Sequence, residues 1–458
     1  MPKKLFALEY VDSQGQRVFC RAKRHDLGLF QEARSEFDRK RRRLHFPRAK
    51  IPVKERTDRR PISNGHHYYH QLFNKRQLLH LSSLFRRIEE VKTQNVRENL
   101  LLAFSDCLAA NNMLCGFAFG YRKLTPLFSI HSYRYVSRPV EGNVWGAKYG
   151  RGTFTRCVKK LIRAKEYANK PYEIRYSERN LERVHLKSVI HKPISTDIAS
   201  WPTDGSHSLV LNGDSTEMQG LPRDSVDIIL TDPPYYDNIS YSELSDFYYV
   251  WLRRGLRASY PDYFGKTSTP YREAIIVRRP KSHEHNKYIE GLVQVFKNCA
   301  QVLKDKGIMV FTYHHKRRKA WLALGHSLVR SGFKIVNVFP LRSEGKSGFH
   351  SHSGNIKWDC VFVCRKSSDT SNTVSIKAII GQAERNLEQW EKRLGESGIG
   401  FSDAERESFR NSLVLCSSSK KGATPKILSQ VFDQLRSFPQ ASKHHHHNAA
   451  SKFDHRTS

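Results

Sequence analysis

Several common features are absent from this 458-residue chain. No stretch reaches the ~18 consecutive apolar residues of a membrane-spanning helix, and the amino end, MPKKLFALEY, lacks the apolar core and cleavage site of a secretory signal. The eight cysteines include no CxxC pair, so neither a zinc knuckle nor a disulfide framework is indicated. Cys360 and Cys364 lie four apart on an expected strand and should face one side as small hydrophobic residues. These features predict a protein of the reducing cytoplasm.

Acidic residues are also scarce. The chain has 44 Asp and Glu against 78 Lys and Arg, a net charge of +34. Such an excess favours a polyanionic partner, because Lys and Arg contacts to phosphate supply most non-specific nucleic-acid affinity. DNA is therefore the expected partner, and the protein is expected to associate with the nucleoid. Five consecutive basic residues are the candidates for phosphate contact, although a merely solvated charged face is the alternative: Arg39, Lys40, Arg41, Arg42 and Arg43.

Changes in pattern along the chain predict four regions. Residues 1–65 should form a β-hairpin and a basic arm, and 66–200 a helical and mixed DNA-binding region. Leu78, Leu81 and Phe85 recur at the spacing of an amphipathic helix within the second region. Residues 201–366 should form an α/β core, and 367–458 a helical, partly disordered tail. The KHHHHNAA stretch near the end is typical of a tag or a low-complexity segment.

The third region alternates strands and helices. Strands are expected over 208–214 and around 226–231, and two more over 334–341 and 358–365 with no helix between them. Apolar strands that alternate with helices predict a mainly parallel sheet covered on both faces. The last two strands should pair antiparallel, because only a loop joins them. The expected class is therefore α/β, with a Rossmann-like, mostly parallel sheet and an antiparallel last strand.

The residues TDPPYYDN at 231–238 follow one of these strands. Pro233 and Pro234 have no backbone N–H and a fixed φ, so they end the strand and stiffen the turn. Asp232 then offers a carboxylate, Pro233 a carbonyl and Tyr235 a flat ring. In open α/β sheets ligands bind beyond the carboxyl ends of the strands. This set suits an exocyclic amine on a planar heterocycle.

Several motifs in order resemble one family. The run LPRDSVDIILTDPPYYDNISYSELSDFYYVWLRR, with LFNKRQLLHLSSL, AFSDCLAANNMLC and VFTYHHK, resembles the amino-group DNA methyltransferases that carry a DPPY motif. It is most similar to the prokaryotic adenine-specific DNA methylases, many of which have a zinc ribbon. The resemblance covers roughly residues 66–366.

The resemblance implies a chemistry and a set of residues. A flipped base would present its amine to S-adenosylmethionine. Adenine N6 is the expected target, and cytosine N4 stays open. The implied roles are catalytic for Asp232, Pro233, Pro234 and Tyr235, cofactor-binding for Gly213, Asp214 and Thr231, and substrate-pocket for Tyr236, Asp237, Asn238, Tyr241 and His314. No metal ligand is implied.

Two family features are missing. The glycine-rich loop that binds the methionine end of the cofactor has only weak candidates, CGFAFG at 115–120 and GAKYGRG at 146–152, and the zinc-ribbon cysteines are absent. The sheet would then be incomplete or split, with a second protein subunit supplying the glycine loop. The alternative is a non-catalytic DNA-binding subunit of a methyltransferase or defence complex. Restriction-modification is one setting that would use either form.

Overall fold

The structure is a computed structural model that describes residues 4–54, 56–129, 131–146, 149–177, 180–186, 192–218, 220–278, 282–343, 356–367 and 375–435. These residues fall into two compact units. The first unit lies within residues 1–212 and 236–284, and the second within 213–235, 285–346 and 352–458. Among the described residues, no helix is long and apolar enough to cross a membrane.

The first unit begins with the predicted hairpin and basic helix. Its elements up to the second helix pair are β1 (Ala7–Val11), β2 (Arg17–Arg21), α1 (Arg24–Lys40), α2 (Arg60–Ser63), η1 (Tyr69–Leu72), α3 (Lys75–Glu89) and α4 (Gln94–Ala110). β1 and β2 pair antiparallel. Asn74 caps α3 by accepting a hydrogen bond from the backbone N–H of Gln77 at 2.8 Å. The hairpin and the helices predicted from periodicity are thus confirmed.

The remainder of the first unit is more irregular. Its elements are β3 (Gly116–Ala118), η2 (Phe119–Tyr121), β4 (Lys123–Thr125), α5 (Phe154–Asn169), β5 (Tyr172–Ser177), β6 (Asn180–His185), β7 (Ile194–Ser195), β8 (Ser208–Leu209), α6 (Tyr241–Leu256) and α7 (Pro261–Phe264). The core of the unit is aromatic. Phe85 of α3, Phe104 of α4 and Trp251 of α6 meet with ring centroids 5.3 to 6.2 Å apart.

The second unit is built on a four-stranded sheet. Its elements are β9 (Val226–Thr231), α8 (Ser282–Val302), β10 (Leu303–Tyr313), α9 (Arg318–Arg330), β11 (Phe333–Arg342), β12 (Trp358–Lys366), α10 (Ile376–Glu396), α11 (Asp403–Lys420) and α12 (Pro425–Gln434). The strand order is β11-β12-β10-β9. β9 and β10 are parallel, whereas β12 is antiparallel to both β10 and β11.

One face of this sheet is covered by helices. Phe311 stacks on Phe362 across the strand pair, at 4.9 Å between ring centroids, and Phe296 of α8 stacks on Phe311 at 5.9 Å. Trp321 of α9 packs on Phe362. Cys360 and Cys364 are buried on the same face, as small hydrophobic residues should be.

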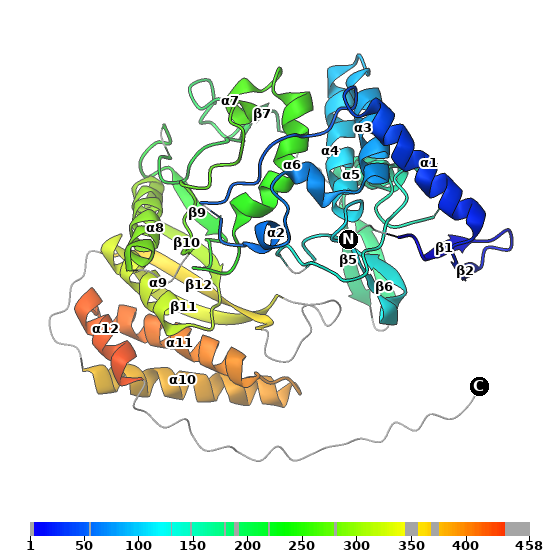
Figure 1. Cartoon of the computed structure of the whole chain (residues 1–458). Coiled ribbons are helices and arrows are strands. Elements are labelled where there is room, and N and C mark those ends of the chain that lie inside the picture. Colours follow the sequence, from blue (N-terminus) through cyan, green and yellow to red (C-terminus); the bar gives the residue numbers. More distant parts are fainter. Residues whose placement is uncertain are drawn as a thin grey trace, which may run out of the picture. The chain divides into compact units, whose positions relative to one another are not determined.

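The carboxyl-terminal helices extend this packing. Helices α10, α11 and α12 lie together in the second unit (Figure 1), and the Ser419 hydroxyl at the end of α11 accepts a hydrogen bond from the backbone N–H of Ile335 at 2.8 Å. The sequence predicted a helical, partly disordered tail over 367–458. The structure continues α11 to Lys420 and adds α12, because Leu428 and Val431 form a buried stripe. The histidine run at 444–447 lies outside the described residues.

Three details of the predicted sheet differ from the structure. The expected antiparallel pairing of the last two strands is confirmed, but β12 inserts between β10 and β11, so two of the three strand pairings are antiparallel and the sheet is not mostly parallel. The other face is not fully covered, because Ile228 and Leu230 of β9 are 62% and 78% exposed.

The third difference is the strand predicted over 208–214. Only Ser208–Leu209 is a strand, and it pairs parallel with β7 in a separate two-stranded sheet. The carboxylate of Asp214 accepts hydrogen bonds from the backbone N–H and the hydroxyl of Thr216, both at 2.8 Å. This local turn competes with strand pairing, as Asp often does near glycine.

Candidate active site

The TDPPY turn lies at the end of the second unit's sheet where β9 and β10 finish and β12 begins. This end of the sheet is called the edge below. Thr231 ends β9 and pairs in register with Phe311 of β10. Because β12 runs the opposite way, its first residues lie at this same edge as the last residues of β10. The edge therefore brings together Asp232, the end of β10 and Asp359 at the start of β12.

A chain of hydrogen bonds joins the turn to β10. The Tyr235 hydroxyl donates to Thr312 Oγ1 at 2.9 Å, and the Thr312 hydroxyl donates to Asp232 Oδ1 at 2.6 Å. Successive donors of this kind polarise one another. Asp232 is exposed, and its second carboxylate oxygen accepts no hydrogen bond from the described residues. The turn thus holds a carboxylate in place with one oxygen facing outward.

The two prolines differ in what their carbonyls do. The hydroxyl of Tyr288, a fully buried residue, donates to the Pro234 carbonyl at 2.6 Å. No donor among the described residues reaches the carbonyl of Pro233. The Pro233 carbonyl is therefore the one left without a donor beside Asp232 among the described residues.

The Tyr235 ring is held on the other side by a histidine. The His314 imidazole meets it edge to face, with centroids 5.0 Å apart and planes at 83°. His314 Nδ1 lies 2.5 Å from Asp359 Oδ1. Burial opposes ionisation of Asp359, but hydrogen bonds from His314 and Ser343 outweigh it and lower the pKa of the carboxyl. An ionised carboxylate only accepts, so Nδ1 of His314 carries the proton.

The Tyr235 hydroxyl keeps its proton. Burial raises its pKa well above the ordinary value, and the carboxylates of Asp232 and Asp359 add to this effect. Tyr235 therefore acts as a hydrogen-bond donor and a ring, not as a phenolate.

The sequence predicted part of this edge. The structure places Asp232, Tyr235 and His314 together, but Thr312 and Asp359 were not singled out. Thr312 could have been found by extending strand alternation: Phe311 and Tyr313 are buried, so Thr312 and His314 share the other face. His315 is buried, and its Nδ1 accepts a hydrogen bond from the backbone N–H of Arg317 at 2.9 Å.

The predicted substrate-pocket residues after Tyr235 belong to the first unit. Tyr236 has φ of 52°, a left-handed conformation that is rare for a bulky residue, and its carbonyl accepts a hydrogen bond from Val277 N–H at 2.9 Å. Its side chain is only 5% exposed and offers little surface to a ligand. Asn238 and Tyr241 are exposed, and Asp237 is partly buried. Their role in a pocket stays a prediction.

The predicted cofactor residues lie in an exposed turn and a strand end. Gly213 has open space around its Cα, and Asp214 is exposed. Asp214 uses one oxygen in its own turn, and its other oxygen has no donor among the described residues. Both residues belong to the second unit, as does Thr231.

The glycine-loop candidates do not have the expected setting. CGFAFG lies in the β3–β4 hairpin and not between a strand and a helix. The second candidate, GAKYGRG, lies partly outside the described residues, at 147 and 148. A Cβ on its Gly152 would lie 2.1 Å from the Cβ of Ala110, so this glycine is required for packing against α4. Neither segment, in its described residues, therefore has the setting of the loop that would hold the methionine end of a cofactor.

The basic cluster lies at the end of α1 and just beyond it, and its five residues are exposed. Lys40 pairs with Glu36 at 2.5 Å, whereas no acidic partner of Arg39, Arg41, Arg42 or Arg43 is found in the described part of the chain. Four arginines thus remain available for phosphate.

The comparison with known families agrees with the chemistry of this edge. The N6/N4 DNA methylase family matches residues 226–456, which is half of the chain and includes β9, the TDPPY turn, β10 and β12. The chain belongs to this family of DNA methyltransferases, whose members generally use S-adenosylmethionine. No curated protein matches the chain.

Proposed function

We propose that the chain is an S-adenosylmethionine-dependent DNA methyltransferase acting on adenine N6, or the catalytic-loop subunit of a split one. The observation that carries the proposal is the pair of acceptors at the turn. Asp232 has a carboxylate oxygen facing outward, and the Pro233 carbonyl accepts no hydrogen bond from the described residues. An exocyclic amine has two hydrogens to donate, and two neighbouring acceptors match them.

The residues of the turn would act on the amine directly. Asp232 and the Pro233 carbonyl would accept its two hydrogens, which draws the nitrogen out of conjugation with the ring and raises its nucleophilicity. Thr312 fixes Asp232 in that position, and Tyr235 offers its ring to the extruded base. The cofactor, when bound, supplies an electrophilic methyl group. Proximity and orientation then carry the reaction without a covalent enzyme intermediate.

The fit to the cofactor is partial. Asp214, with Gly213 and Thr231, would contact the cofactor. Neither glycine-rich candidate has the setting of the loop that binds its methionine end. We therefore propose that the Rossmann-like sheet is completed by a second protein subunit. Two features support this: β9 is the outermost strand of its sheet, and Ile228 and Leu230 on it are 62% and 78% exposed. An apolar edge strand of this kind normally has a cover.

Two other functions remain as candidates. The same acceptors would suit the N4 amine of cytosine, because they bind an amino group and not a particular ring. A non-catalytic DNA-binding subunit is favoured because neither glycine-rich candidate has the setting of the cofactor loop and because arginines 39 and 41–43 are exposed. Such a subunit would bind DNA with steep salt dependence and transfer no methyl group.

The test is transfer of a labelled methyl group to unmethylated DNA, by the chain alone and with the product of the adjoining reading frame. Asp232→Asn should lower the rate about 100-fold or more, since positioned proton acceptors contribute ~10²–10⁴. Asp227→Asn is the control, because Asp227 lies on β9 but is exposed and paired with Lys304 at 2.7 Å. Digestion of the product to nucleosides distinguishes N6-methyladenine from N4-methylcytosine. An Asp232→Asn protein as active as the control would refute the proposal.

A further inference from the structure

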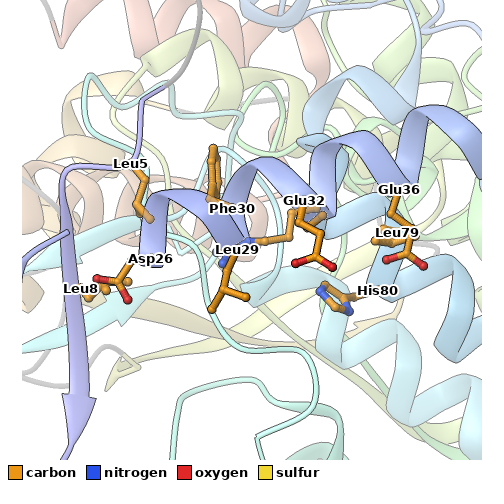
Figure 2. A pocket seen from close by; sticks show the side chains of 11 residues that line it. Leu5, Leu8, Asp26, Leu29, Phe30, Glu32, Glu36, Leu79 and His80 are labelled. Atoms are coloured by element: carbon orange, nitrogen blue, oxygen red, sulfur yellow. The ribbon is translucent and has the colours of Figure 1, made fainter. Parts of the chain in front are cut away.

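A pocket of about 330 Å³ lies in the first unit, apart from the TDPPY turn and its partners. It is formed by the start of the hairpin, by α1 and by α3 (Figure 2). Its apolar surface comes from Leu5, Leu8, Leu29, Phe30 and Leu79. The volume is at the lower end of the ~300–1,000 Å³ of ligand sites.

The pocket exists because α1 packs on α3 along only part of its length. Asp26, Leu29, Phe30 and Ala33 recur at the three- and four-residue spacing of one helix face, and all of them line the pocket. Phe37, one turn further on, is the only residue of α1 that is buried. Leu29 remains 53% exposed. Among the described residues, the apolar face of the amino-terminal half of α1 is thus only partly covered.

The rim of the pocket is acidic, in contrast to the rest of the chain. Asp26, Glu32 and Glu36 line it, and Glu32 and Glu36 extend from successive turns of α1 toward the side where His80 projects from α3 (Figure 2). The Asp26 carboxylate accepts the backbone N–H of Lys23 at 2.8 Å, and Glu36 pairs with Lys40. Glu32 has no partner among the described residues.

The basic groups of the pocket are already engaged. Arg76 donates two hydrogen bonds to Glu141, at 2.6 and 2.9 Å, and lies over the Phe30 ring. His80 Nδ1 accepts a hydrogen bond from the Trp145 indole at 3.0 Å. The free charge at the rim is therefore negative.

We propose that this pocket binds a basic amphipathic segment of a partner protein. An aliphatic or aromatic side chain of the segment would enter between Leu29 and Leu79, and a neighbouring Lys or Arg would pair with Glu32. The carboxylates repel DNA phosphates, so this surface serves a partner other than the substrate of a methyltransferase. An exposed apolar surface with a charged rim is typical of a protein interaction site, and a helix laid in a groove is a common mode of recognition.

The experiment measures binding of a fluorescein-labelled peptide to the full chain by fluorescence anisotropy. The probe is a 12-residue amphipathic peptide with Leu at helical spacing and Lys at its other positions, and a matched peptide has Glu for each Lys. We expect saturable binding of the Lys peptide only. Glu32→Lys and Leu29→Asp should each raise its Kd at least 10-fold.

Two control variants make the same chemical changes elsewhere. Leu102→Asp replaces a leucine of α4 that is 55% exposed, and Glu388→Lys reverses an exposed charge on α10. Each should change the Kd less than twofold. Equal losses in the controls, equal binding of the Glu peptide, or no saturable binding would overturn the proposal. A dimer that Leu29→Asp dissociates in sedimentation would show that a second copy of the chain occupies the pocket instead, and this too would overturn it.

Discussion

Asp246 and Asp232 are both hydrogen-bonded to tyrosine hydroxyls, Asp246 directly and Asp232 through Thr312, but their surroundings differ. Asp246, on α6 in the first unit, is fully buried and accepts from Thr269 N–H at 2.9 Å, from Tyr271 at 3.0 Å and from Tyr69. Asp232, in the second unit, is exposed and accepts only from Thr312 among the described residues. The first carboxylate is saturated by its own chain, whereas the second has capacity left for a ligand.

The difference shows how similar residue types serve stability in one place and chemistry in another. Glu243, one turn before Asp246, is likewise 1% exposed and accepts the backbone N–H groups of Thr57 and Asp58, at 2.5 and 3.0 Å. Both acids belong to the YSELSDF part of the motif that resembles the methylases. Within that motif, the acids after the turn therefore stabilise the first unit, and the acid of the turn faces outward.

The largest expected effect separates the two aspartates by stability. Asp246→Ala should lower the free energy of unfolding by about 3 kcal/mol, because two buried hydroxyls and an N–H lose their acceptor. Asp232→Ala should change it by less than about 0.5 kcal/mol, since Asp232 is exposed. Urea unfolding followed by circular dichroism measures both. Similar losses in the two variants would show that the contrast between buried and exposed carboxylates is mistaken.

A smaller effect is expected at Asp359, which acts through His314. Asp359→Asn should lower kcat for methyl transfer about 10-fold, or ~1.4 kcal/mol, because the amide loses the charge-assisted hydrogen bond that orients His314 against Tyr235. Asp359 is in this view a positioning residue.

The control for this prediction is Asp305→Asn, which removes an exposed carboxylate paired with Lys366. The ¹⁵N chemical shifts of the His314 ring should move in Asp359→Asn and stay unchanged in the control. A fall in kcat without a change at His314 would contradict the positioning role.

The pH dependence of stability should have opposite signs at Asp246 and Asp359. Burial raises the pKa of Asp246 despite its hydrogen bonds, so the folded state holds its proton to higher pH than the unfolded chain, whose Asp pKa is ~3.9. Stability therefore falls as the pH rises from that value through the folded pKa. Asp359 has a lowered pKa, so its contribution is present above ~3.9 and is lost as the pH falls through the folded value.

Difference curves would reveal these signs. The free energy of unfolding is measured between pH 3 and 7 for the natural chain and for the Asn variant at each position. The natural chain should lose stability relative to Asp246→Asn with rising pH, and gain it relative to Asp359→Asn. Slopes of the same sign would contradict the assigned directions.

The sequence predicted what depends on local pattern. The hairpin, α3 and β9 follow from local pattern, and the TDPPY turn from the chemistry of proline. Asp359 could not be predicted, because its place beside His314 depends on β12 inserting between β10 and β11, which is a matter of long-range pairing.

The burial of acidic residues could not be predicted from the sequence either. Asp246 lies next to the apolar face that Phe247 and Trp251 form, but one of its donors, Tyr69, is 177 residues away in the chain. Of the strand predicted over 208–214, only Ser208–Leu209 forms, and Asp214 instead makes a local turn with Thr216. Sequence reasoning was thus reliable for single elements and weak for contacts between distant ones.

The smallest expected effect concerns the hydroxyl of Tyr235. Tyr235→Phe keeps the ring and its contact with His314 but removes one donor to Thr312, which can still donate to Asp232. We expect kcat/KM for DNA to fall less than about threefold, whereas Tyr235→Ala should lower it ~10- to 100-fold, because stacking on a base contributes ~1–3 kcal/mol.

The matched change is Tyr69→Phe, in the buried hydrogen-bond network around Asp246. It removes one donor to the Asp246 carboxylate. It should lower the free energy of unfolding by about 1–2 kcal/mol, while Tyr235→Phe leaves that free energy nearly unchanged. Should Tyr235→Phe reduce methyl transfer as much as Tyr235→Ala does, the hydroxyl relay and not the ring would be what the turn contributes. Tyr235 would then resemble Tyr69, as a residue that orients an aspartate, and the base would need another surface on which to stack.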